Sequence, residues 1–321
     1  MVLTDRIDRA QQSRRRVGIG VATVKKFSED HSSNLASMIA FWAFFSIFPL
    51  LLVGVTVLGF VLSGGTKTTV LENVASLLPL LKAGSVKSLS GSWWAVIVGG
   101  ATALWSGLAV MRTTQTAFNA TWEIPEKDRP GLPKQLARSL LALATIGVGL
   151  VAATIVSSFV TGTQNAIPLA WWGRLAGYAI SLVLDVGLFM LAFRILTERK
   201  VSFRDVRPGA ILSGVAFFVL QQISSFIVSR KLGGAQSTYG NFATVITILW
   251  WFYLQAQITL LGAQLNVVLR ERLYPRSLVG EPSTEADKRA LQAYAEEGTY
   301  AEREEVDARF GEECERAPRA R

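Results

Sequence analysis

The sequence predicts an all-α membrane protein, a polytopic bundle of six transmembrane helices with both termini in the cytoplasm. Only 18% of the 321 residues are charged and the mean hydropathy is +0.34, whereas about a quarter of a soluble domain is charged. The missing charge leaves six long apolar windows. These windows are continuously apolar and do not alternate, which disfavours a transmembrane β-barrel.

Each window can hold a helix of about 20 residues, the length that crosses ~30 Å of hydrocarbon. A helix satisfies its own backbone hydrogen bonds, as the bilayer interior requires. One window contains a single charged residue, Asp185, and the others contain none. The windows are 36–66, 88–111, 139–173, 175–193, 208–229 and 232–269.

The distribution of Lys and Arg predicts the orientation. The two terminal segments and the second and fourth connecting loops carry 27 of these residues, and the other three loops carry 6. Without the C-terminal segment the ratio is still 17 to 6, and basic residues favour the cytoplasmic side. The first 35 residues are polar and charged, so we expect no cleavable signal peptide and expect the first window to direct insertion.

This topology divides the chain into three regions, residues 1–35, 36–270 and 271–321. Residues 1–35 form a cytoplasmic segment, in which the helical spacing of Val21, Val24 and Phe27 predicts an interfacial helix. Residues 36–270 form the membrane domain.

The first outer loop and the C-terminal tail are expected to contain helices as well. Apolar residues at helical spacing predict an amphipathic outer helix near 70–82. The charged cytoplasmic tail, 271–321, is expected to be partly helical and partly disordered. Within it, Thr284 and Asp287 have the spacing of a capping box for a helix that begins near 285.

The composition argues against several kinds of chemistry. One cysteine, Cys314, cannot form an internal disulfide, and with one histidine, His31, it cannot build a His/Cys zinc shell. Phosphate-loop, nucleophile-elbow and zincin motifs are missing from the sequence. We therefore expect no catalytic residue, no metal, no cofactor and no enzyme activity. The net charge of +9 lies in clusters beside the apolar windows, which predicts contact with anionic lipid head groups and not with nucleic acid.

Asp185 is the ionisable residue well inside a window. A charge at that depth costs at least ~2.5–3.5 kcal/mol, so the side chain should face the bundle interior or a wet cavity. One interpretation is a proton- or cation-linked site. The other is a protonated or hydrogen-bonded Asp that ties helices together.

Polar and small residues share one face of the last window. Trp251, Gln255, Thr259, Gly262 and Asn266 follow one another at steps of four, four, three and four residues. This stripe suits tight helix–helix contact, and it equally suits a polar path, to which Gln222 of the fifth window would contribute.

Three further features bear on the helices. Pro49 lies inside the first window and is expected to break or kink it. Pro208 and Gly209 are expected to start the fifth helix. Asn119 fits a glycosylation sequon, but the predicted loop is cytoplasmic.

Five stretches of the sequence resemble the YihY/BrkB family of bacterial inner-membrane proteins, a group once labelled ribonuclease BN. The stretches are IAFWAFFSIFPLLL (39–52), FNATWEIPEKDR (118–129), RPGA (207–210), YGNFATVITILWWFY (239–253) and LLGAQLN (260–266). The residues that carry the motifs are Pro49, Asn119, Pro208, Gly209, Tyr239, Gly240, Trp251, Gly262 and Asn266. The resemblance implies six helices in the inner (plasma) membrane with both ends cytoplasmic. Gln264 stands where the family often has glutamate.

Two functions are therefore expected from the sequence. The first is a transporter or flippase-like protein without its own ATPase, with Asp185, Gln222, Gln255, Thr259 and Asn266 along its path. The alternative is a non-transporting envelope scaffold whose tail binds a cytoplasmic partner. Ribonuclease activity is not expected, and the sequence gives no prediction of oligomeric state.

Overall fold

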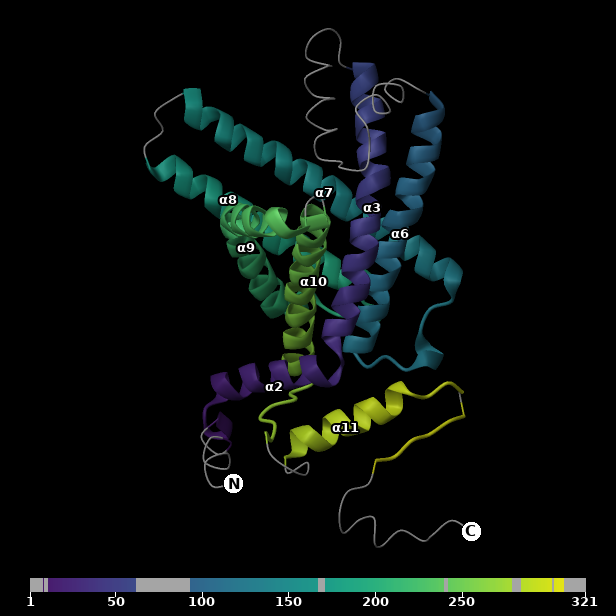
Figure 1. Cartoon of the computed structure of the whole chain (residues 1–321). Coiled ribbons are helices and arrows are strands. Elements are labelled where there is room, and N and C mark those ends of the chain that lie inside the picture. Colours follow the sequence, from purple (N-terminus) through teal and green to yellow (C-terminus); the bar gives the residue numbers. More distant parts are fainter. Residues whose placement is uncertain are drawn as a thin grey trace, which may run out of the picture. The chain divides into compact units, whose positions relative to one another are not determined.

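The structure, a computed structural model, describes most of the chain. It covers residues 8, 11–61, 93–166, 171–239, 242–278, 284–301 and 303–308. Across these residues every regular element is a helix (Figure 1). The predicted outer helix at 70–82, together with Gly240 and Cys314, falls outside the described residues.

Six long helices carry the apolar windows, and five of them are long and apolar enough to cross a membrane over Ser32–Leu50, Val96–Thr121, Leu175–Leu196, Phe203–Ile223 and Val245–Arg270. The sixth, α7, has 35 residues. The six helices are α3 (Ser32–Val61), α6 (Trp93–Thr121), α7 (Leu132–Ala166), α8 (Trp171–Leu196), α9 (Phe203–Tyr239) and α10 (Phe242–Arg270). The chain is therefore an α-helical, multi-pass membrane protein, while the count of six spans and the orientation stay predictions.

The chain divides into two compact units, each made of several stretches of sequence. Unit 1 comprises Met1–Leu35, Gln115–Val219 and Gln257–Arg321. Unit 2 comprises Ala36–Thr114 and Leu220–Ala256. Both α9 and α10 contribute residues to each unit.

In unit 1, α8 packs against α7 and α9. An ideal Cβ on Gly149 of α7 would stand 2.3 Å from Leu188 Cδ2, and one on Gly214 of α9 would stand 2.5 Å from Val186 Cγ2. Both glycines thus make room for α8 side chains. Val183 of the same helix is 69% exposed, as expected of a side chain that faces lipid.

In unit 2, α3 and α6 make the corresponding close contact. An ideal Cβ on Gly99 of α6 would stand 3.2 Å from Leu52 of α3, so the small size of this glycine allows the two helices to approach closely. Helix α3 continues from Ser32 to Val61 through Pro49, so no break occurs there.

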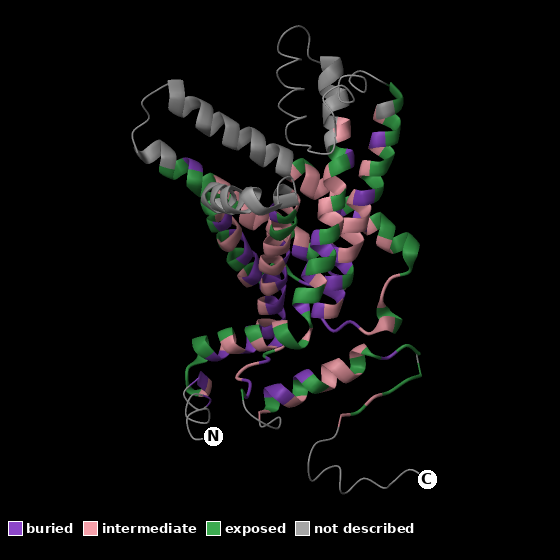
Figure 2. Cartoon of the chain, in the orientation of Figure 1, coloured by how far each residue is buried: buried purple, intermediate pink, exposed green. Residues whose placement is uncertain are grey.

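Two helices belong to the polar ends of unit 1. Helix α2 (Arg15–Glu29) contains the predicted N-terminal helix, and α11 (Glu285–Glu297) begins where the capping box places it. Thr284 Oγ1 accepts a hydrogen bond from Asp287 N, and the Asp287 side chain accepts one from Thr284 N. Helix α11 has both a buried and an exposed face (Figure 2).

Helix α9 begins earlier than the sequence predicts. It starts at Phe203, so Pro208 lies inside the helix and not at its first residue. Ser202 N donates to Asp205 Oδ2 at 2.8 Å, and this side chain satisfies a backbone donor at the start of the helix. Asp205 therefore determines where α9 begins, and the Pro208-Gly209 pair does not.

Candidate functional site

Helices α9 and α10 meet through two glycines. An ideal Cβ on Gly209 would stand 2.0 Å from the carbonyl oxygen of Gly262, and one on Gly262 would stand 2.7 Å from the carbonyl oxygen of Gly209. Real Cβ atoms do not approach backbone oxygen so closely. The two backbones are therefore in direct contact, and both motif glycines are explained by the space available.

Two side chains hydrogen-bond across this contact. Gly209 N donates to Asn266 Oδ1 at 2.6 Å, and Ser213 Oγ donates to the carbonyl oxygen of Ile258 at 3.0 Å. Asn266 is buried, and its Nδ2 has no hydrogen-bond partner among the described residues. At this end of the stripe, the geometry is that of a helix–helix contact.

Asp185 lies on the face of α8 that meets the neighbouring helices. Residues one turn apart share a helix face, and Leu188 and Phe189 follow Asp185 by one turn. Leu188 packs against Gly149 of α7, and the Phe189 ring centroid lies 5.8 Å from that of Phe217 of α9. Asp185 itself is half-buried, and the described residues provide it with no hydrogen bond or ion pair.

The other residues of the predicted path divide between the two units. Asp185, Thr259 and Asn266 belong to unit 1, and Gln222 and Gln255 belong to unit 2. Gln222 is exposed, whereas Gln255 and Thr259 are half-buried. Of these five residues, the structure thus places Asn266 in the α9–α10 contact.

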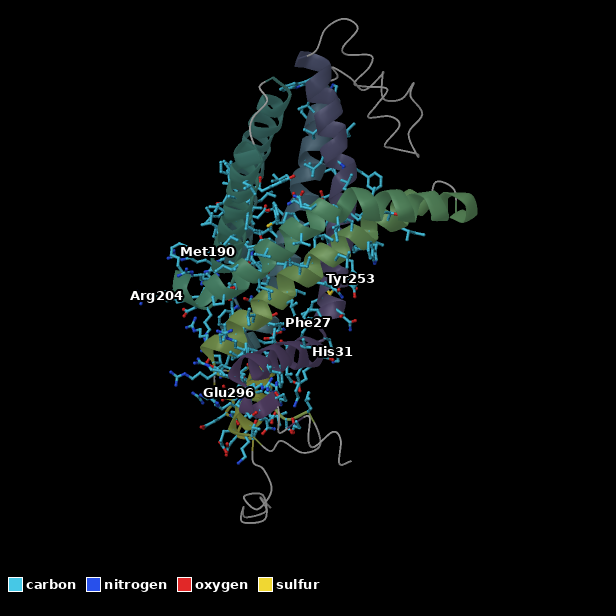
Figure 3. All side chains as sticks on the ribbon, turned by 90° about the vertical axis from the view of Figure 1, so that its left-hand side faces the viewer. Phe27, His31, Met190, Arg204, Tyr253 and Glu296 are labelled. Carbon is cyan, nitrogen blue, oxygen red and sulfur yellow. The ribbon has the colours of Figure 1, made fainter. Side chains whose placement is uncertain are left out.

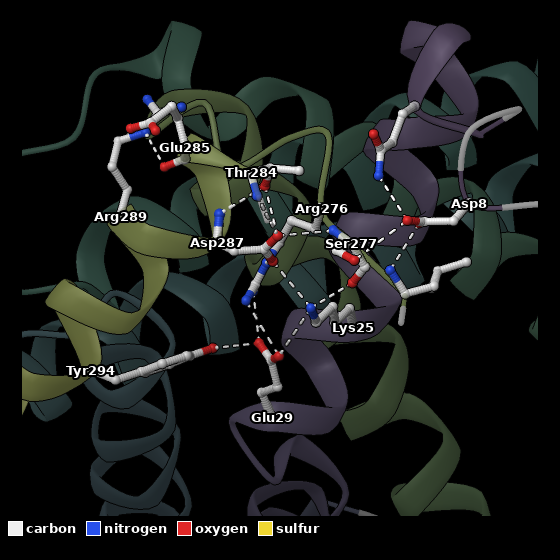
Figure 4. A network of polar contacts seen from close by, with 12 residues as sticks. Asp8, Lys25, Glu29, Arg276, Ser277, Thr284, Glu285, Asp287, Arg289 and Tyr294 are labelled. Carbon is white, nitrogen blue, oxygen red and sulfur yellow. Dashed lines mark hydrogen bonds and ion pairs between the residues drawn. The ribbon is translucent and has the colours of Figure 1, made fainter. Parts of the chain in front are cut away.

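Charged and polar side chains gather instead around α2 and α11, close to the labelled Glu296 (Figure 3). The contacts of Arg276 are central to this region (Figure 4). Its side chain is only 1% exposed. Arg276 Nη1 lies 2.7 Å from Glu29 Oε2 of α2, and Nε lies 3.0 Å from Asp287 Oδ1 of α11. One buried cation thus joins α2, the segment after α10 and α11.

Asp287 collects several donors at this junction. Its carboxylate accepts hydrogen bonds from Ser277 N at 3.0 Å and Lys25 Nζ at 3.1 Å, in addition to the Thr284 hydroxyl at 2.7 Å. Burial opposes ionisation of Asp287, but these hydrogen bonds and that of Arg276 outweigh it and lower the pKa to about 2. The carboxylate therefore stays charged at neutral pH.

Asp8 extends the same contacts to the N-terminal segment. Its carboxylate accepts from Leu278 N at 2.9 Å and from Gln11 Nε2 at 3.0 Å. Gln11 Nε2 also donates to the carbonyl oxygen of Arg276 at 2.7 Å. We call Asp8, Gln11, Lys25, Glu29, Arg276, Ser277, Thr284 and Asp287 the tail network.

A second cluster surrounds Lys26, which is fully buried. Lys26 Nζ lies 3.0 Å from Asp30 Oδ2 and also binds Glu123 Oε1, on the turn that follows α6. Tyr294 OH of α11 donates to Asp30 Oδ1 at 2.7 Å. Gln264 Nε2 of α10 donates to Asp30 Oδ2 at 2.7 Å. We call these five residues the Lys26 cluster.

Glu123 is the titratable group of this cluster with a shifted pKa near neutrality. Burial raises its pKa, the attraction of Lys26 offsets only part of that effect, and Asp30 and Glu297 add repulsion, so that the pKa reaches about 7. The main chain at Glu123 has a φ of 50°, in the left-handed region that non-glycine residues seldom adopt. The surrounding contacts thus fix both the backbone and the carboxyl group.

Sequence reasoning did not find the tail network or the Lys26 cluster. Most of their pairs join residues that are far apart in sequence, such as Arg276 with Glu29, and no local spacing marks those pairs. Two local signals were available: the capping box of α11, and the spacing of four between Lys26 and Asp30.

Asn119 and its neighbours in the FNATWEIPEKDR motif connect the end of α6 to α8, to the segment after α8 and to α10. Asn119 Oδ1 accepts from Glu198 N at 3.3 Å. The Phe118 ring packs on Phe193 of α8 at a centroid distance of 5.4 Å, and the Arg270 guanidinium lies 5.4 Å from the Trp122 ring. Asn119 is buried, with a structural contact for its side chain.

These helices define a multi-pass membrane protein with a polar assembly at one end of unit 1. The family model described as Virulence factor BrkB matches residues 23–287, and the chain belongs to this family. The match includes the C-terminal half of α2, the α9–α10 contact, most residues of both polar clusters, and the start of α11.

Two relatives illustrate the range of the family. The chain is 24% identical to the ribonuclease-like protein YfkH of Bacillus subtilis over 261 residues, which cover 77% of this chain and 93% of YfkH. It is 26% identical to a UPF0761 membrane protein of Stenotrophomonas maltophilia (strain K279a) over 275 residues, 81% of this chain and 62% of that protein. The chain thus spans less than two thirds of this UPF0761 relative. No solved structure matches the chain.

Proposed function

We propose that the protein is a transporter or flippase-like protein of the bacterial plasma membrane, with six spans, both termini cytoplasmic and no ATPase of its own. Asp185 carries the proposal. It lies on the α8 face toward α7 and α9, and the described residues give it no ion pair. An ionisable group at that depth is costly, so its presence points to a functional site. Asp185 is the proposed protonatable group, and its ligand is a solute or a lipid.

Replacing Asp185 tests this function. We expect Asp185→Asn in proteoliposomes to abolish movement of a fluorescent phospholipid or a pH-driven solute flux, because Asn keeps the shape but cannot bind and release a proton. Asp185→Glu should retain part of the rate. Glu305→Gln removes the same charge from an exposed tail position and is the matched control.

The result of that experiment can be interpreted only if each variant is inserted and folded. Size-exclusion chromatography in detergent should show that each variant is inserted and folded like the parent chain. If the Asp185→Asn variant moves lipid or solute at the same rate as the parent chain, the proposed role of the carboxyl group is contradicted.

The proposed orientation has its own test. Cys314 is the one cysteine of the chain, and it lies in the tail that the charge distribution assigns to the cytoplasm. A membrane-impermeant maleimide should label it only after cells are opened. Labelling in intact cells would reverse the orientation.

A non-transporting scaffold is the second candidate, favoured by the docked tail. A groove of about 730 Å³ lies between the turn after α6, α11 and the segment that follows it. Its lining includes Glu296, Glu304, Glu305 and Asp307. A variant in which Glu304, Glu305 and Asp307 are all changed to their amides leaves the tail network intact. If this variant loses an envelope phenotype but moves lipid or solute normally, the scaffold is favoured.

The name of YfkH adds ribonuclease activity as a competing function. We propose that the chain is not an enzyme. In the part of the chain that the structure describes, no group of three or more His, Cys, Asp or Glu side chains could hold a metal ion. Incubation of the purified protein with RNA and divalent metal tests this, and cleavage that resists removal of contaminating nuclease would overturn it.

A further inference from the structure

One face of α2 is apolar and open. Val17, Val21, Val24 and Ser28 follow one another at steps of four, three and four residues, so they share a face. Val17 and Val24 are 45% and 63% exposed. An added Cβ on Gly20, which lies beside them, would meet no atom within 4 Å.

The opposite face of α2 is occupied by the protein itself. Gly18, Ala22 and Lys26 are buried there, and an ideal Cβ on Gly18 would stand 3.6 Å from Pro275. The contacts that use α2 to hold the tail therefore leave the valine face free.

The segment after α10 extends the apolar surface. Leu278 is exposed, and it lines a groove of about 530 Å³ together with Gly20, Val21 and Val24. Acidic residues of the tail network also lie at this surface. Glu29 lines the groove and is paired with Arg276, and the Asp8 carboxylate accepts a hydrogen bond from Leu278 N at 2.9 Å.

Basic side chains flank the valine face. Arg14 and Arg16 are exposed at the start of α2, and the structure pairs neither with an acidic group among the residues it describes. An apolar helix face with arginines at its N-terminal end suits a helix that lies in an interface with anionic lipid.

Chain connectivity places this surface at the height of the membrane boundary. Helix α2 ends at Glu29, and the first candidate span begins at Ser32. Leu278 follows the last candidate span, which ends at Arg270, by eight residues. Both parts of the surface are thus tied to the end of a span.

We propose that the valine face of α2, with Leu278, docks on the anionic phospholipid surface of the protein's own membrane. The valines and Leu278 enter the head-group region, and Arg14 and Arg16 contact the phosphates. This surface is separate from the proposed path at Asp185 and would hold in a transporter or a scaffold.

Site-directed spin labelling of the full chain tests the proposal. Cys314→Ser removes the one native thiol, and Val24→Cys then carries the label, with Lys288→Cys on the exposed surface of α11 as the matched control. The labelled chain is reconstituted into phosphatidylcholine vesicles with and without phosphatidylglycerol. Accessibility to oxygen and to a water-soluble nickel chelate is then compared.

We expect the Val24 label to be more accessible to oxygen than to nickel in the anionic vesicles, and the Lys288 label to show the reverse. Arg14→Gln with Arg16→Gln should shift the Val24 label toward nickel, as should high salt, which screens surface charge. Equal nickel accessibility at both positions would overturn the proposal. So would protection of Val24 that depends on protein concentration and not on lipid charge, which would indicate a second copy of the chain.

Discussion

The α9–α10 contact and the tail network both hold unit 1 together, but they use opposite kinds of interaction. At the contact, the backbones of Gly209 and Gly262 touch, and an amide and a hydroxyl supply the hydrogen bonds. The tail network is built around charged side chains, with Arg276 buried between two carboxylates. Charge inside a bilayer is costly, whereas a network beside water can exchange ion pairs for hydration. Each region therefore depends on a different property, space in one and charge pairing in the other.

The largest effect should come from adding volume at the contact. Gly209→Val would drive side-chain atoms into the Gly262 carbonyl oxygen. We therefore expect the free energy of unfolding to fall by about 3 kcal/mol, or no folded protein at all. Thermal unfolding in detergent measures it. Gly187→Ala, at a position where a Cβ meets no atom within 4 Å, is the control and should leave the unfolding temperature unchanged or slightly raised.

Removal of a buried charge should have the next largest effect. Arg276→Met leaves Glu29 and Asp287 without their shared cation, but the Glu29 side chain is 32% exposed and can be hydrated. The loss in unfolding free energy should therefore lie below the ~3–5 kcal/mol that breaking a fully buried pair costs. That loss should be local, because α11 can leave α2 while the spans remain folded. Hydrogen exchange should increase in α11 and not in α8; equal exchange in the parent and variant would show that the network does not hold the tail.

A smaller effect is expected from the amide at the contact. Asn266→Ala removes the acceptor of Gly209 N, and an interhelical hydrogen bond in a membrane protein contributes ~0.6 kcal/mol on average. The shift in unfolding temperature should be far below that of Gly209→Val. A shift as large as that of the glycine variant would mean that Asn266 has another role, such as the lining of a path.

At Glu123 we expect a change in the pH dependence of stability. Its pKa in the folded chain is raised to about 7 from 4.5, so the folded state holds a proton that the unfolded state releases. Stability contributed by this group is full below pH 4.5 and is lost as the pH rises through about 7. Glu123→Gln should keep the stability at low pH and flatten the decline between these values, and an unchanged pH profile would contradict the raised pKa.

Asp287 has the opposite sign in the same experiment. Its pKa is lowered to about 2, so its contribution to stability is present above the unfolded value of 3.8 and is lost as the pH falls toward 2. Asp287→Asn should remove this acid sensitivity. Loss of α11 docking at low pH in that variant would mean that another carboxylate is responsible.

What could be predicted from the sequence was local. The apolar windows gave the long helices, and the spacing of Thr284 and Asp287 gave the start of α11, because periodicity and capping are determined by residues a few positions apart. The start of α9 differed because Asp205 caps the helix before the Pro-Gly pair.

The contacts between distant segments could not be predicted in this way. The pairing of Asn266 with Gly209 depends on which glycines of two helices meet, and the pairing of Arg276 with Glu29 joins residues 247 positions apart. A stripe of polar residues shows which of them share a face, but it does not show what stands opposite each one. Asp185 remains a predicted site for the same reason.

Gln264 gives the polar assembly a mechanical consequence. Its amide donates to Asp30 at 2.7 Å and to Ser32 Oγ at 2.9 Å, while Asp30 also accepts from Tyr294 of α11. Any rotation or sliding of the last turns of α10 must therefore pull on the end of α2 and on α11 together. A fluorophore on α11 would follow the movement of α10 from the water side, so conformational cycling could be observed without a label inside the membrane.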